Sequence, residues 1–115
     1  MDARLLFPNE YLGAPDLRGK DVALTIARVV RETLRTQDGD EIKPIIYFKE
    51  MEERHAKDPS ELNRKLVLNK TNATTIMGQL GNETDDWIGQ KITLFATTCQ
   101  AFGQTVDCIR VRGKK

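Results

Sequence analysis

Three pairs of adjacent carboxylates and a single histidine are the side chains of this sequence best suited to acid–base or metal chemistry. The pairs are Asp40-Glu41, Glu52-Glu53 and Asp85-Asp86, and the histidine is His55. The first pair lies in a predicted turn, and the second pair and the histidine lie in a highly charged segment. We expect all of these to be solvated, because polar connections usually run over the surface.

Asp85-Asp86 has two interpretations. A pair of carboxylates can bind a divalent metal ion. Asp85-Asp86 immediately precedes Trp87, however, and follows Asn82-Glu83-Thr84, a context that favours the capping of a short turn. The sequence also has no glycine-rich phosphate loop and no G-x-S-x-G motif. We therefore expect no enzymatic activity and no metal or other cofactor.

Aromatic side chains combined with cations offer a different chemistry, the binding of single-stranded nucleic acid by base stacking. The aromatic residues are Phe7, Tyr11, Tyr47, Phe48, Trp87, Phe95 and Phe102. Tyr47 is the strongest candidate, because residues 43–49 alternate as a strand and an inward Phe48 would place Tyr47 and Lys49 outward. Lys65 would lie beside them on the next strand.

Other side chains could frame a groove around Tyr47. They are Arg28 and Arg35 on and after the first strand, Phe102 in the last hairpin loop, and Arg110 and Arg112 on the last strand. Each is equally well explained as an ordinary exposed residue. Trp87 could also stack on a base, but we favour a structural role, in which its indole N–H is bonded to a carbonyl and its ring closes one end of the fold.

Five strands are predicted to position these side chains. The first covers residues 21–34 and has a bulge at Val29-Val30, where the alternation of apolar residues breaks. A turn centred on Asp38-Gly39 leads to the second strand at 43–49, with Pro44 near its start. The remaining strands cover residues 65–69, 91–98 and 105–112.

One short helix is predicted at 71–80, between the third and fourth strands, capped by Thr71 or Asn72 and ended by Gly81. Its apolar residues share one face: Ala73, Ile76, Met77 and Leu80. This order of elements predicts a mainly β fold, a five-stranded OB-fold-like Greek-key barrel. Such barrels commonly bind oligonucleotides or oligosaccharides.

The 115 residues are enough for one domain, which we place at 21–112. We expect an irregular arm at 1–20, a basic tail at 113–115, and at 50–63 either a polar loop or a loop with a short helix around 51–56. The arm would pack on the barrel through four side chains, Leu5, Phe7, Tyr11 and Leu12. The N-terminus lacks the apolar core of a signal peptide, which favours a cytoplasmic protein.

Charge and cysteine content add weaker constraints. The net charge is +1, with −3 in residues 1–63 and +4 in residues 64–115, so the second half is mildly basic. Cys99 and Cys108 flank the predicted last hairpin turn, and we expect free thiols. They would lie opposite each other if the turn centres between Gly103 and Gln104, and offset if it centres between Phe102 and Gly103.

Three segments resemble a group of small phage and prophage proteins. They are Leu68-Asn69-Lys70-Thr71-Asn72-Ala73, Asp85-Asp86-Trp87-Ile88-Gly89-Gln90-Lys91-Ile92-Thr93-Leu94 and Val106-Asp107-Cys108-Ile109-Arg110-Val111. Phe7-Pro8, Tyr11-Leu12 and Asp16-Leu17-Arg18-Gly19-Lys20 are similar to that group as well. The resemblance implies an OB-like core and a gene neighbourhood of replication or recombination.

The sequence thus predicts a non-enzymatic binder of single-stranded nucleic acid, with DNA as the expected ligand. The alternative is a protein-interaction module that docks onto a phage or host replication protein through an exposed strand edge. A weaker alternative is an accessory subunit that binds carbohydrate or another small ligand.

Overall fold

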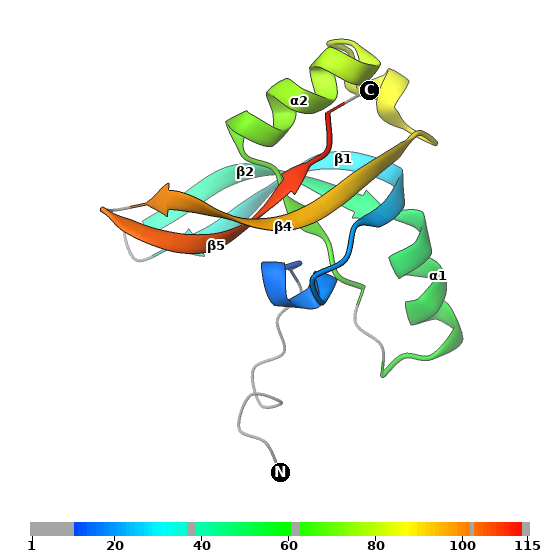
Figure 1. The fold of residues 1–115 in the computed structure, drawn as a ribbon. Helices are drawn as coiled ribbons and strands as arrows, with labels where there is room; N and C mark the ends of the chain where they lie inside the picture. The colour runs from blue at the N-terminus through cyan, green and yellow to red at the C-terminus, as the bar shows by residue number, and fades with distance from the viewer. Residues whose placement is uncertain (1–10, 37–38, 61–62, 102, 114–115) are drawn as a thin grey trace.

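The computed structural model describes residues 11–36, 39–60, 63–101 and 103–113, and one five-stranded antiparallel sheet forms its centre (Figure 1). The strands are β1 (Val22–Thr36), β2 (Gly39–Phe48), β3 (Leu66–Val67), β4 (Lys91–Ala101) and β5 (Gln104–Val111), in the order β3-β2-β1-β4-β5. The helices are α1 (Lys49–Lys57), α2 (Lys70–Leu80) and the short 3-10 helices η2 (Ala14–Leu17) and η3 (Thr84–Trp87). The prediction of a mainly β protein with a helix between the third and fourth strands is confirmed.

Strand β1 bends so that it can pair with two neighbours. Residues 22–25 pair with β4, and residues 26–36 pair with β2. The register shifts between Ile26 and Arg28, so Ala27 is the extra residue of a bulge. A bulge was predicted in this strand, but at Val29-Val30, slightly farther along the chain.

The sheet does not close into a barrel, in contrast to the prediction, because β3 and β5 are not paired. β3 is only two residues long, and the segment before η2 contacts Lys65, the residue just before it. Tyr11 forms a parallel bridge with Lys65, and the Leu12 N–H donates to the Lys65 carbonyl at 2.8 Å. The expected packing of the arm is therefore confirmed for Tyr11 and Leu12, and Leu5 and Phe7 lie outside the described residues.

The Asn72 side chain provides β5 with hydrogen-bond partners that a neighbouring strand would otherwise supply. Its side chain is 1% exposed, the Nδ2 group donates to the Ile109 carbonyl at 3.0 Å, and Oδ1 accepts from the Val111 N–H at 3.3 Å. Asn72 was predicted as one of two candidate caps of α2. The observed cap is Asn69, whose side chain accepts from the Asn72 N–H.

The hydrophobic core lies between the sheet and the elements around it. Its buried members are Leu17, Leu24, Ile26, Ile46, Phe48, Leu66, Leu68, Ile76, Trp87, Ile92, Leu94, Ile109 and Val111. Trp87 is 3% exposed and its indole N–H donates to the Gly81 carbonyl at 2.9 Å, which confirms the structural interpretation. Gly81 ends α2 with a positive φ of 94°, as predicted.

The charged segment after β2 begins with α1, which confirms a helix there, longer than the one considered at 51–56. Glu50 in its first turn fastens α1 to β1. The Glu50 carboxylate accepts hydrogen bonds from both the backbone N–H and the hydroxyl of Thr25, each at 2.7 Å. Burial acts to raise the pKa of Glu50, but the bonds from Thr25 outweigh it and hold the pKa below its ordinary value.

Pro44 lies in the middle of β2 rather than near its start. It is opposite Arg31 of β1, and its carbonyl accepts from the Leu68 N–H at 2.9 Å. Because the N and O atoms of one strand residue point to the same side, the missing N–H of Pro44 faces away from β1. The proline therefore costs β2 no hydrogen bond to β1.

Strands β4 and β5 form a long hairpin in which Ala101 is opposite Gln104, so the turn centres between residues 102 and 103. Cys99 is opposite Val106 and Cys108 is opposite Thr97, so the two cysteines are offset. Both are half-buried free thiols. Burial and the neighbouring Cys99 thiol raise the pKa of Cys108.

Candidate functional site

Tyr47 lies on the outer face of β2, as predicted, but it is buried rather than exposed. Its exposed fraction is 8%, and its hydroxyl donates a hydrogen bond to Glu32 of β1. That bond and burial raise the pKa of Tyr47, while the charge of Lys65 opposes them. The prediction of an open stacking platform is therefore wrong in its geometry, because neighbouring side chains cover the ring.

Arg28 and Lys65 are two of the covering side chains. The Arg28 guanidinium carbon lies 3.9 Å from the centroid of the Tyr47 ring, and the Lys65 ammonium lies 5.1 Å from it. Arg28 also bonds both carboxylate oxygens of Glu52 in α1, at 2.9 and 3.0 Å. The structure thus brings Arg28, Tyr47 and Lys65 together. The two cations form cation–π interactions with the Tyr47 ring.

The other predicted residues near this face are less informative. Lys49 is exposed, but it begins α1 and does not continue β2 as expected. Arg35 lies in β1, and its side chain is outside the described part of the structure. Phe102 also lies outside the described residues.

Arg110 and Arg112 belong to a second cluster, on the other half of the sheet. Arg110 is half-buried opposite Phe95 of β4. The Arg112 guanidinium lies 3.9 Å from the centroid of the Phe95 ring and bonds both oxygens of Asp21 at 2.9 and 3.0 Å. Because β1 and β4 lie between β2 and β5, these arginines do not join Tyr47 in one groove.

Asp40-Glu41 is exposed, as predicted, and Asp85-Asp86 is exposed as well, whereas Glu52 of the remaining pair is half-buried in its ion pair with Arg28. Asp85 and Asp86 are exposed inside the short helix η3, which confirms a turn before Trp87. The cap residue of η3 is Glu83, and no side-chain cap bond forms, so the predicted capping by Asp85-Asp86 is not observed. Within residues 11–36, 39–60, 63–101 and 103–113, no cluster of three or more potential metal ligands occurs.

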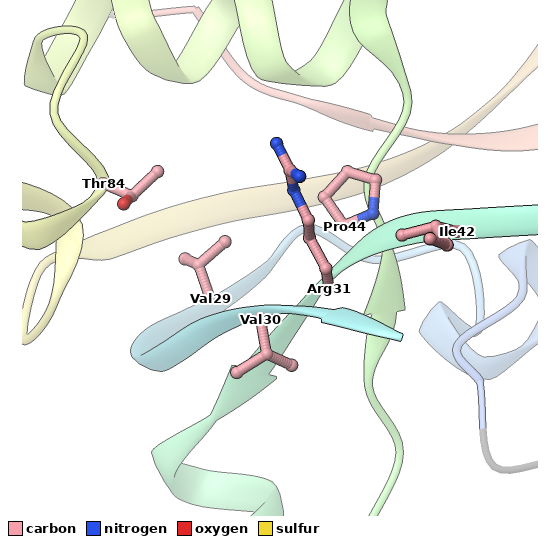
Figure 2. Close-up of a pocket in the computed structure, with 6 residues that line it drawn as sticks. All are labelled: Val29, Val30, Arg31, Ile42, Pro44 and Thr84. Carbon is pink, nitrogen blue, oxygen red and sulfur yellow. The ribbon is translucent and has the colours of Figure 1, made fainter. Parts of the chain in front are cut away.

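The inner face of the β1–β2 hairpin carries a cleft that the sequence did not point to. Its volume is about 650 Å³, and Figure 2 shows the six residues that line it: Val29, Val30, Arg31, Ile42, Pro44 and Thr84. Arg31 is exposed, and among the described residues it has no acidic partner. Ile42 is 69% exposed, the highest value among the large exposed apolar side chains that the structure describes.

The register of the hairpin explains how Arg31 reaches this cleft. Val29 is opposite Ile46, which is a core residue, so Val29 lies on the inner face. Arg31 is two positions later in the strand and therefore lies on the same face. The bulge at Ala27 determines which of the following residues of β1 face inward. Sequence alternation alone could have found Arg31 if the bulge had been placed correctly, but nothing local indicates that Thr84 lies nearby.

No protein-family model matches the chain, and neither a curated protein nor a solved structure shows significant similarity to it. The resemblance to small phage proteins therefore stays a prediction. Among the described residues, none of the helices has both the length and the apolar character needed to cross a membrane.

Proposed function

We propose that this protein binds single-stranded nucleic acid, without catalysis, through an OB-like core. The observation that carries the proposal is the strand order β3-β2-β1-β4-β5 with α2 between β3 and β4. A sheet of this order becomes a Greek-key barrel of the OB type if β3 and β5 approach each other. OB-folds bind oligonucleotides on strands 2 and 3 and on the loops of the 1–2 and 4–5 hairpins.

The two long hairpins and the exposed cations support this proposal. The β1–β2 and β4–β5 hairpins extend toward the same side in Figure 1. Arg28, Arg31 and Lys49 are exposed on or next to the first hairpin. The ion pair of Arg28 with Glu52 is half exposed, and such pairs contribute only about 0–1 kcal/mol, so a phosphate can replace the carboxylate.

DNA is the proposed ligand, and phage replication or recombination is the proposed setting. Both come from the resemblance to small phage and prophage proteins, together with the OB-like order of elements. A replication or recombination protein is the corresponding proposed partner.

The test is a fluorescence anisotropy titration with a labelled oligothymidylate of about 20 nucleotides. If about three phosphates are neutralised, raising the salt from about 50 to about 200 mM should weaken binding roughly 20-fold. A duplex of the same length is the control and should bind more weakly. Absence of binding at micromolar protein and low salt would refute the proposal.

A protein-interaction module is the second candidate, favoured by the open strand edges. Among the described residues, the edge of β5 away from β4 is bonded by the Asn72 side chain at Ile109 and Val111 and pairs with no strand, and β2 pairs with β3 only at Ile45 and Ile46. Unpaired edges of this kind can accept an extended peptide as an additional strand. Failure of the oligonucleotide titration would favour this candidate.

A further inference from the structure

The cleft on the inner face of the β1–β2 hairpin combines an apolar surface with one cation. Ile42 and Pro44 come from β2, Val29 and Arg31 come from β1, and Thr84 comes from η3. Figure 2 shows the Arg31 side chain extending from the strand on the same side as Thr84, whereas Val30 points the opposite way. The working surface is therefore formed by the five residues other than Val30.

The size and chemistry of the cleft fit a nucleotide. Ligand sites usually measure about 300–1,000 Å³, and this cleft measures about 650 Å³. Val29, Ile42 and Pro44 offer apolar atoms to the face of a base. Arg31, with no acidic partner to displace among the described residues, offers a planar fork of donors that matches a phosphate. No described lining residue is aromatic, so the base contact would be aliphatic packing.

The charges around the cleft set the direction in which a nucleotide would lie. Glu83, Asp85 and Asp86 flank Thr84 and are exposed, so they repel a phosphate from that wall. Arg31 attracts the phosphate to the β1 wall. The uncharged edge of the base is then left to face Thr84, whose hydroxyl can both donate and accept a hydrogen bond.

We propose that this cleft is a subsite for one nucleotide of the bound strand, with the phosphate on Arg31 and the base against Val29, Ile42 and Pro44. The inference rests on the proposed binding of single-stranded nucleic acid and specifies a place for it. It assigns the main contact to the inner face of the hairpin instead of the outer face around Tyr47.

The phosphate contact is tested with Arg31→Ala and a matched control, Arg54→Ala. Arg54 is also exposed, lies on α1 and has the same charge, so both variants lose one positive charge. At low salt, Arg31→Ala should weaken oligothymidylate binding by about tenfold, whereas Arg54→Ala should change it by less than about twofold. Arg31→Ala should also reduce the slope of log affinity against log salt by about 0.7.

The base contact is tested with Ile42→Ser and two oligonucleotides of equal length, one of thymidylate and one of abasic deoxyribose phosphate. Because Ile42 is 69% exposed, the change should leave folding intact, which thermal unfolding checks. Thymidylate binding should weaken by about fivefold, since an apolar contact is lost, while abasic binding stays unchanged.

Each result has a separate meaning. If the wild-type protein binds thymidylate and Arg31→Ala matches Arg54→Ala, the subsite is refuted but the proposed function stands. If the wild-type protein binds no oligonucleotide, both fail, and the cleft becomes a candidate surface for a protein partner. Equal weakening of both oligonucleotides by Ile42→Ser would refute the base contact.

Discussion

Replacement of Asn72 by alanine tests how the open edge of β5 is stabilised. The side-chain amide of Asn72 is buried and bonds the Ile109 carbonyl and the Val111 N–H. Asn72→Ala removes both bonds at once. The cap of α2 stays in place, because it depends on the Asn69 side chain and the backbone N–H of residue 72.

The expected loss of stability follows from the two backbone groups left without partners. Each such group costs about 1–3 kcal/mol when it stays buried. A cavity of about 190 Å³ is lined by Asn72 and Ile109, so water can enter the space beside the truncated side chain and the low end of that range applies. The better helix propensity of alanine offsets about 0.5 kcal/mol of this loss in stability. We therefore expect a net loss of about 1.5 kcal/mol in the free energy of unfolding.

Urea unfolding monitored by circular dichroism measures this loss directly. The matched control is Thr74→Ala in the same helix, where the side chain is exposed and its hydroxyl bonds only the Lys70 carbonyl. The control should change stability by less than about 0.5 kcal/mol. If Asn72→Ala and Thr74→Ala unfold at the same urea concentration, Asn72 does not hold the β5 edge and the reasoning fails.

Gly81→Ala should lower stability by about 1–3 kcal/mol, because its φ of 94° is strained for alanine, whereas Gly78→Ala in α2 has open space and should raise it by about 0.5–1 kcal/mol. Thermal unfolding that ranks the two variants in the reverse order would contradict this. Glu50→Gln should be less stable than the wild type at neutral pH. The lowered pKa of Glu50 means that its contribution is present above pH 4.5 and is lost as pH falls through the folded-state value. A stability difference that does not shrink in acid would be the contrary result. Trp87→Phe should cost about 1–2 kcal/mol in urea unfolding through the lost bond to the Gly81 carbonyl, and an unchanged midpoint would show that this bond is not needed.

Periodic patterns predicted much of the fold, because they follow directly from burial on one face. The apolar face of α2 and the stop at Gly81 were found in this way. The position of the bulge was not, since Val29 and Val30 are both apolar and fit either phase of the strand. The open form of the barrel was not predicted either. It depends on Asn72, which takes the place of a strand partner of β5, whereas the local sequence indicates only a helix cap at Asn72.

The outer face of β2 shows why the site was harder to predict than the fold. Alternation correctly placed Tyr47 opposite the core, but it says nothing of the side chains that neighbouring strands lay over that face. Here Arg28 and Lys65, expected to line a groove beside an open ring, cover the ring instead. Arg112 and Phe95 repeat the arrangement on the other half of the sheet.

Arg28 and Arg31 carry the same charge on one strand but offer a ligand different things. Arg28 is already bonded to Glu52 and packed on Tyr47, so a phosphate must compete for it. Arg31 has no such competitor among the described residues and stands beside exposed apolar atoms. Arg28 and Arg31 lie on opposite faces of the hairpin. A nucleic-acid strand can contact both of them only by crossing the edge of the hairpin, where β2 extends beyond β3. Under the proposed function, binding energy should therefore concentrate on the inner face, with Arg28 contributing mainly to the salt dependence.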